Sequence, residues 1–334
     1  MALSNSRIEV AMSARRKASS PRRLWSCQDA CSNSRTAETR NMPVPMVQIT
    51  SSTREFRMLI IDTHAHIYSP DETKYPPIEK PLRPPGGKGS VVDLRKESAA
   101  AGVRAVCAIQ TSTFYRFDNR YICDAAAANR GWVAGVCTLD PDGAGSPATL
   151  TRFVKEYGIR GMRSIPARDG HLDHPGVRAL WKAAEAAGIV INVLVNRDKT
   201  AELDRMLGDF PGLRVVLDHC MNVKAGPDMD AIVADVVRLA RRPNLHAKLT
   251  FLPTGSAAGF PCADMHAACL RIVDAFTPDR CVWGSDFPCE LWCPKVTYEQ
   301  HLRIFTEVLA LDTRSREAIL GGVARRLWFP KMEG

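Results

Sequence analysis

Residues 159–194 read IRGMRSIPARDGHLDHPGVRALWKAAEAAGIVINVL and contain one complete strand–helix–strand unit. Apolar runs rich in Val and Ile at 159–162 and 189–194 predict two buried strands, and the apolar spacing across 175–187 predicts a helix between them. Gly188 stands directly before the second run, where a left-handed residue is needed to end the helix. This stretch therefore predicts a β–α–β unit with parallel strands.

The same unit recurs along the chain from Met58 onward. Strand-like runs follow one another at intervals of about 30 residues, the length of a β–α unit. They cover residues 59–62, 103–109, 132–136, 159–162, 189–194, 213–217, 245–249 and 281–283, and helical patterns lie between them at 118–129, 146–157, 175–187, 228–241 and 263–276. Eight such units predict an α/β protein with a single (β/α)8 TIM barrel, and a doubly wound open sheet is the alternative.

The composition separates a leader from this repeated part. The chain has 334 residues, 45% hydrophobic and 24% charged, and a net charge of +9. Residues 1–57 carry ten Arg or Lys against four acids, together with ten Ser, and so hold +6 of that charge. They show no periodicity and predict a disordered basic leader, either a transit peptide or an extension before a natural start at Met58. Residues 58–330 are predicted to form one barrel domain.

Several function classes are excluded by what the sequence lacks. No apolar run approaches the roughly 18 residues of a membrane span. No RNP, helix-turn-helix or zinc-finger pattern accompanies the basic leader, so we expect no nucleic-acid partner. The 11 cysteines are scattered and no apolar signal segment follows the basic start, which favours a cytoplasmic protein with reduced thiols, or organelle targeting by the leader. The sequence leaves a homo-oligomer open.

Polar residues at the ends of the predicted strands are the candidate site, because barrel enzymes carry their chemistry there. His64 and His66 are two residues apart and share one face of an extended strand, so both imidazoles could bind a metal or carry protons. Asp286 follows the last strand and could be a metal ligand or a general base. His219 follows the sixth strand. Loop histidines, a helix N-cap and a core histidine are the respective structural alternatives.

Four basic residues near strand ends point to an anionic small-molecule substrate. Arg163 and Lys248 end the fourth and seventh strands, and Arg116 and Arg120 follow the second strand. A guanidinium fork matches a carboxylate, and a buried charge without a partner would be costly. The alternative is pairing with protein acids such as Asp118, which for Arg116 and Arg120 has at least equal weight.

Taken together, five short motifs resemble the amidohydrolase superfamily: IDTHAH at 61–66, DNRY at 118–121, GMR at 161–163, KLT at 248–250 and WGSDFP at 283–288. More narrowly, they are similar to the amidohydrolase-related group with 2-pyrone-4,6-dicarboxylate lactonase-like and sugar-lactone hydrolases. The resemblance covers residues 58–330. It implies a catalytic barrel and a hydrolase that cleaves a lactone or similar cyclic ester. A metal-dependent decarboxylase of the same superfamily is the alternative.

Two departures from the family pattern bear on the metal. Metal-dependent relatives carry a further His at the end of the fifth strand, where this chain has only Asn192 and Asn196. Arg163 stands where a lysine would carry a bridging carbamate, which disfavours a two-metal centre. Two alternatives remain: one Zn²⁺ or Mn²⁺ held by His64, His66 and Asp286, or a metal-free site.

The resemblance and the residues together predict a mechanism. Asp286 takes a proton from water, which attacks the ester carbonyl. His64, His66 and His219, or one metal held by the first two, stabilise the developing oxyanion. Arg163 and Lys248 hold a carboxylate of the substrate.

Overall fold

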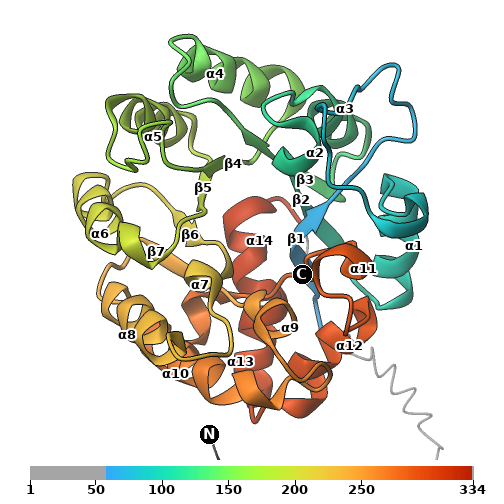
Figure 1. Ribbon diagram of the computed structural model, residues 1–334, viewed down its shortest axis with the longest axis vertical. Coiled ribbons are helices and arrows are strands. Elements are labelled where there is room, and N and C mark those ends of the chain that lie inside the picture. Colours follow the sequence, from blue (N-terminus) through green and yellow to red (C-terminus); the bar gives the residue numbers. More distant parts are fainter. Residues whose placement is uncertain (1–57, 333–334) are drawn as a thin grey trace, which may run out of the picture. The chain divides into compact units, whose positions relative to one another are not determined.

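Eight parallel strands form one sheet in the order of the sequence, in a computed structural model that describes residues 58–332 (Figure 1). Each strand pairs with the next one, as expected for consecutive β–α units. The predicted disordered leader, residues 1–57, lies outside the described residues. The strands are β1 Ile61–His66, β2 Ala105–Ile109, β3 Val133–Thr138, β4 Gly161–Ser164, β5 Val190–Val193, β6 Val215–Leu217, β7 Leu245–Lys248 and β8 Cys281–Val282.

The segment after β8 closes the sheet against β1. The backbone N–H of Thr63 donates to Trp283 O (3.1 Å), that of Asp286 to His64 O (2.8 Å) and that of His66 to Phe287 O (2.7 Å). We call this contact between the first strand and residues 283–287 the seam. It confirms the predicted barrel and excludes the open doubly wound sheet.

Helices surround the strands (Figure 1). The bounds of α4 and α5 coincide with the predicted ones, and both helices end at a glycine with positive φ, Gly158 (72°) and Gly188 (66°). The α-helices are α1 Val91–Ala100, α2 Ser112–Tyr115, α3 Arg120–Ala128, α4 Ser146–Tyr157, α5 Pro175–Ala187, α6 Thr200–Asp209, α7 His219–Asn222, α8 Met229–Leu239, α9 Phe251–Gly255, α10 His266–Phe276, α11 Cys289–Trp292, α12 Tyr298–Arg303, α13 Thr313–Glu317 and α14 Val323–Trp328.

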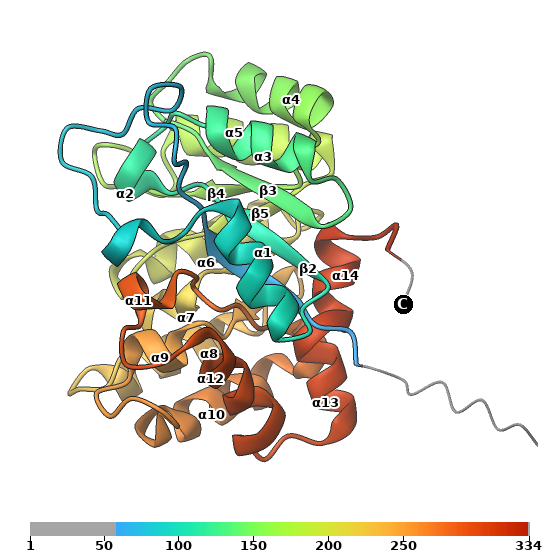
Figure 2. The ribbon, with the colours of Figure 1, turned by 90° about the vertical axis from the view of Figure 1, so that its right-hand side faces the viewer.

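Helix α14 covers one end of the barrel (Figure 2). Its buried Val323 and Trp328 pack in one cluster with strand residues such as Ile61, Ala105 and Val190. These strand residues lie toward the amino ends of their strands, so α14 closes that end. The opposite end, at the carboxyl ends of the strands, is not covered by α14 and contains the candidate site.

One prediction about β1 was wrong in its bounds. The apolar run 59–62 suggested a strand that ends before the histidines, but β1 continues to His66. His64 and His66 therefore lie inside the strand, and the hydrogen bonds of the seam hold them there.

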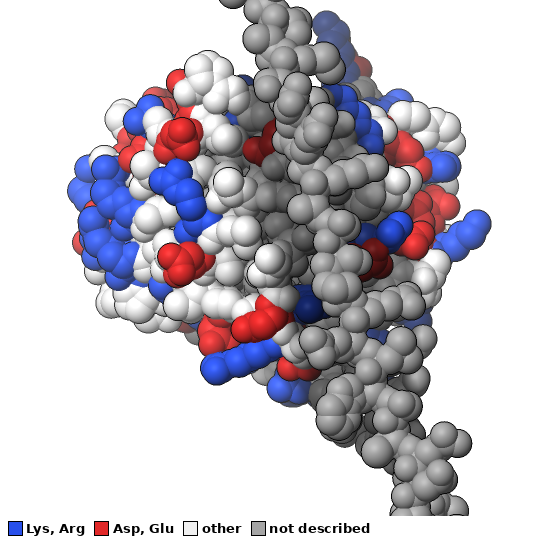
Figure 3. Space-filling model, turned by 90° about the horizontal axis from the view of Figure 1, so that it is seen from below, with Lys and Arg blue, Asp and Glu red and all other residues white. Residues whose placement is uncertain are grey.

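Exposed charges on the described part are mixed in sign. Figure 3 shows acidic and basic side chains interspersed over one face. Exposed side chains of opposite charge also form pairs, as between Arg152 and Glu156 (3.7 Å) and between Arg303 and Glu307 (2.9 Å). Within residues 58–332, no helix combines the length and the apolar character that a membrane span requires.

Candidate active site

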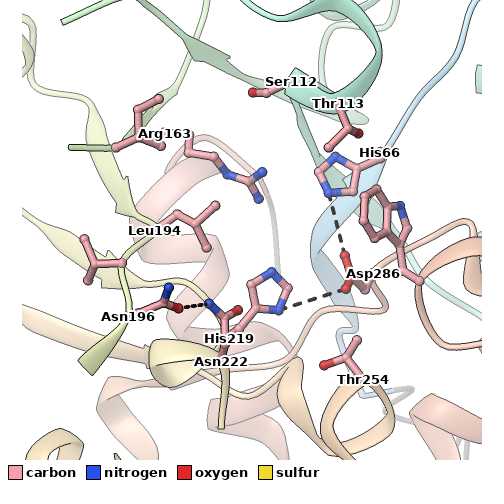
Figure 4. Close-up of a pocket in the computed structure, with 13 residues that line it drawn as sticks. His66, Ser112, Thr113, Arg163, Leu194, Asn196, His219, Asn222, Thr254 and Asp286 are labelled. Carbon is pink, nitrogen blue, oxygen red and sulfur yellow. Dashed lines mark hydrogen bonds and ion pairs between the residues drawn. The ribbon is translucent and has the colours of Figure 1, made fainter. Parts of the chain in front are cut away.

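The four predicted catalytic side chains converge at the end of the barrel opposite α14. His64 Nε2 lies 3.3 Å from His66 Nε2 and 3.5 Å from Asp286 Oδ1, and His66 Nε2 lies 3.7 Å from the same oxygen. His219 Nδ1 is 4.0 Å from Asp286 Oδ2 (Figure 4). Residues more than 200 positions apart in the sequence are thus brought into one cluster, as the strand-end argument predicted.

The seam fixes the positions of His64 and Asp286. Asp62 is fully buried, and its carboxylate accepts hydrogen bonds from the backbone N–H of His64 (3.0 Å), from the backbone and hydroxyl of Ser285 (2.9 and 2.6 Å) and from Tyr298 OH (2.9 Å). Asp286 then adopts a φ of 59°, a left-handed conformation that is rare outside glycine. Both residues are therefore held by backbone contacts rather than by side-chain packing alone.

A left-handed turn presents His219. All four residues of α7, from His219 through Cys220 and Met221 to Asn222, have positive φ, between 46° and 61°. This conformation costs about 1–2 kcal/mol per non-glycine residue, and such strain is concentrated at functional sites. The turn brings both His219 and Asn222 to the cavity. Thr250 Oγ1, 2.7 Å from His219 Nδ1, fixes the imidazole.

A buried ionic group lies beneath these residues. Lys248 Nζ is 2.8 Å from Asp218 Oδ1, Arg163 Nε is 3.2 Å from Asp218 Oδ2, and Asn192 Nδ2 donates to Asp218 Oδ1 (3.2 Å). Burial alone would raise the pKa of Asp218, but Lys248 and Arg163 lower it to about 2. Asp218 is therefore ionised and holds Lys248 and Arg163 in place. Its position directly after a strand did not indicate this role.

Burial also sets the protonation of the three histidines and Asp286 in this candidate site. It raises the pKa of Asp286 to about 7, against the opposing effect of the Arg163 charge. It lowers the pKa of His219 to about 3 and that of His64 and His66 well below the usual value. Near neutral pH the three imidazoles are therefore neutral, and Asp286 exchanges its proton readily.

A cavity of about 450 Å³ opens over this cluster (Figure 4). His66, His219, Asp286 and Arg163 contribute to its wall. Further polar side chains come from the connections after the strands, mostly from short helices, and Asn222 Nδ2 donates to Asn196 Oδ1 (2.7 Å). Among them the sequence marked only Asn196, at the end of the fifth predicted strand. These residues are Ser112, Thr113, Asn196, Asn222, Thr254 and Trp292, and the apolar part of the wall is Ile165, Leu194 and Val195.

Of the four basic residues predicted to bind substrate, the structure brings only Arg163 to the cavity. Lys248 is fully buried below the cavity as the partner of Asp218. Arg120 is exposed and forms an ion pair with Asp118 (2.6 Å), which is the alternative considered from the sequence. Arg116 lies over the ring of Phe117, with 5.8 Å between guanidinium carbon and ring centroid, and does not line the cavity.

The spacing of three donor atoms fits a small divalent cation. His64, His66 and Asp286 each offer one ligand atom, and all three atoms lie within 4.8 Å of one another. In a tetrahedral zinc site with ligands at about 2.1 Å, neighbouring donors are about 3.4 Å apart. The observed separations of 3.3 to 3.7 Å match this value, so these residues could hold one metal ion.

Comparison with known proteins agrees with the fold and identifies the family. Residues 61–329 match the model of the amidohydrolase family. The chain belongs to the amidohydrolase family. This amidohydrolase is an enzyme of the hydrolase class, as the sequence motifs predicted.

Two relatives of this amidohydrolase are similar to it in sequence. The L-fucono-1,5-lactonase of Burkholderia ambifaria is 28% identical over 200 residues, which are 59% of this chain and 69% of the relative. The D-galactarolactone isomerase of Agrobacterium fabrum is 28% identical over 244 residues, 68% of this chain and 76% of the relative. Both names refer to lactones of sugar acids.

Two solved structures share the barrel. A Pseudomonas putida protein assigned as a 2-pyrone-4,6-dicarboxylic acid hydrolase superposes with a TM-score of 0.69 at 22% identity, over 83% of this amidohydrolase and 100% of that chain. The 5-carboxyvanillate decarboxylase of Sphingomonas paucimobilis superposes with a TM-score of 0.58 at 18% identity, over 81% and 99%. At these identities the likeness concerns the fold.

Proposed function

We propose that this amidohydrolase hydrolyses a lactone by general-base activation of water. One observation carries the proposal: a buried carboxylate, Asp286, whose pKa is raised to about 7, lies at the cavity wall between His66 and His219. A base with such a pKa combines a useful fraction of carboxylate with real proton affinity near neutral pH. An ester carbonyl is electrophilic enough for a water molecule activated in this way.

The hydrogen-bond partners of the histidines assign their roles. His66 Nδ1 lies 3.1 Å from Ile109 O, so it carries the ring hydrogen, and Nε2 offers a lone pair that can accept a hydrogen from the attacking water. We assign the Thr250 hydroxyl as the donor to His219 Nδ1, which puts the ring hydrogen of neutral His219 on Nε2. This N–H can donate to the carbonyl oxygen as it becomes negative.

The reaction then proceeds in two steps. Water adds to the carbonyl carbon while Asp286 takes its proton, and the carbonyl π electrons move onto oxygen. The tetrahedral intermediate collapses, the ring C–O bond breaks, and Asp286 returns the proton to the departing oxygen. A metal ion held by His64, His66 and Asp286 would, when bound, polarise the carbonyl and lower the pKa of a bound water.

The wall of the cavity favours a hydroxylated lactone over a dicarboxylate. It offers one guanidinium, Arg163, and five hydroxyl or amide side chains that can exchange hydrogen bonds with hydroxyl groups. Trp292 adds an indole face of the kind on which sugar rings pack. The names of the two sequence relatives agree with this choice. We therefore narrow the predicted anionic substrate to a sugar lactone with at most one carboxylate.

A lactone screen tests the proposal. Acid release is followed with a pH indicator on aldono-1,5-lactones, aldono-1,4-lactones and 2-pyrone-4,6-dicarboxylate, and an enzyme-free solution corrects for spontaneous hydrolysis. We expect the hydroxylated lactones to be hydrolysed fastest. Conversion of one lactone into another without acid release, seen by NMR, would instead indicate an isomerase. Release of CO₂ from an aromatic acid, without lactone turnover, would favour the alternative decarboxylase and refute the proposal.

A further inference from the structure

Arg163 reaches the same nitrogen atom that a metal ion would use. Its Nη2 lies 2.8 Å from His64 Nε2, closer than any other partner of that nitrogen, and its Nε is fixed 3.2 Å from Asp218 Oδ2. Because a guanidinium can only donate, His64 Nε2 must accept from it. The lone pair that would bind a cation is thus already engaged by a cation of the protein.

Positive charges of the protein already lie beside the candidate metal ligands. Arg163 and Lys248 both form ion pairs with Asp218, and Arg163 also contacts His64. A further buried carboxylate, Asp62, is directed at hydrogen-bond donors of the seam. A divalent ion on His64 and His66 would add two positive charges with Arg163 at hydrogen-bond distance, and like charges at such separations repel by several kcal/mol at an effective dielectric constant of about 20.

Arg163 also faces the cavity, and one nitrogen of its guanidinium, Nη1, is available to a ligand. Its guanidinium points toward the centre of the cavity in Figure 4. Nε and Nη2 have protein partners, whereas Nη1 has none among residues 58–332. A fixed guanidinium with a free N–H at a carbonyl oxygen supplies the positive charge that neutral histidines lack.

We propose that Arg163 takes the place of a catalytic metal ion in this enzyme. Its guanidinium is the electrophile at the substrate carbonyl oxygen, and it keeps divalent cations away from His64 and His66. As water adds, the electron pair of the carbonyl moves onto oxygen and is stabilised by the Arg163 N–H groups until the ring C–O bond breaks. The electrophile role rests on the proposed lactone hydrolysis, whereas the exclusion of metal does not.

Metal binding and kinetics of matched variants test the two parts separately. Chelator-treated wild type, Arg163→Met and the surface control Arg152→Met are dialysed against Zn²⁺. We expect Arg163→Met to bind one Zn²⁺ at least about tenfold more tightly than the other two, because one repelling charge is gone. The added substitution His64→Asn should abolish this gain. Tight binding of one Zn²⁺ by wild type, with no gain in Arg163→Met, would overturn the proposal.

Kinetics then address the electrophile. On the best lactone, chelator should leave wild-type turnover unchanged, and Arg163→Met should lower kcat by about 10²- to 10³-fold with a smaller effect on KM. A rise in KM alone would mean that Arg163 only binds substrate and would refute the electrophile role. Circular dichroism checks folding. If Arg163→Met does not fold, Arg163→Gln, which also lacks the positive charge, replaces it in both assays. Dialysis remains decisive even if no lactone is hydrolysed.

Discussion

The raised pKa of Asp286 makes a quantitative prediction for the pH dependence of catalysis. A general base works as the carboxylate, and with a pKa of about 7 the carboxylate fraction is about 9% at pH 6 and about 91% at pH 8. The value of kcat/KM should therefore rise about tenfold between these pH values and level off above pH 8. With an ordinary aspartate pKa near 3.8, it would be flat over the same range.

The assay is a stopped pH series on the best lactone, in which the acid product is quantified by chromatography at each pH. An enzyme-free solution serves as the blank, because lactones also hydrolyse spontaneously in alkaline solution. The Asp286→Asn variant should lose a factor of about 10² to 10⁴ in kcat and show no sigmoidal rise. A flat wild-type profile between pH 6 and 8, or a variant that keeps more than a tenth of the activity, would refute the assignment of Asp286 as the base.

Three further substitutions test the supports of the site. Lys248→Met leaves the buried Asp218 carboxylate with a missing counter-ion and should cost about 3–5 kcal/mol of unfolding free energy in urea titrations; an unchanged midpoint would contradict the ionic anchor. Thr250→Val removes the hydrogen bond to His219 and should lower kcat about tenfold with KM nearly unchanged, so an effect on KM alone would argue against an orienting role. Gly284→Ala would place a Cβ 2.8 Å from a backbone nitrogen of β1 and should destabilise by about 1–3 kcal/mol and lower kcat, whereas a wild-type melting curve would show that the seam can relax.

Much of the fold was accessible from the sequence because each β–α unit carries its own signals. Apolar runs marked all eight strands, and glycines such as Gly158 and Gly188 marked helix ends at positions where the structure has positive φ. The bounds of β1 were missed for a physical reason. Its second half is held by backbone hydrogen bonds to residues 283–287, and pairing with a distant segment leaves no trace in local hydrophobicity.

The site was predictable in its catalytic centre but not in its wall. Strand ends converge in any barrel, so His64, His66, His219 and Asp286 could be placed together. A strand-end position does not say whether a side chain points to the cavity or to another strand end. The sequence therefore predicts that Lys248 contacts the substrate, although in the structure it is the buried partner of Asp218.

The cavity residues that come from the connections after the strands could not be predicted for another reason. Asn222 reaches the cavity only because four consecutive residues of α7 adopt left-handed φ values. None of these residues is a glycine, so nothing in the sequence marks the turn. Connections of this kind determine which substrate fits. For that reason the sequence alone could not identify a particular lactone.

The seam has a consequence for biosynthesis. β1 is among the first parts of the barrel to be made. The hydrogen bond from Thr63 to Trp283 cannot form until Trp283, 220 positions further along the chain, has been made. At about 5–20 residues per second, the ribosome needs roughly 10–40 s to supply that partner. Throughout this interval one edge of β1 lacks its native neighbour, and such an edge is a template for mispairing. The contact that closes the barrel is also the one that positions Asp286, so the candidate site is assembled only after residues 283–287 have been made.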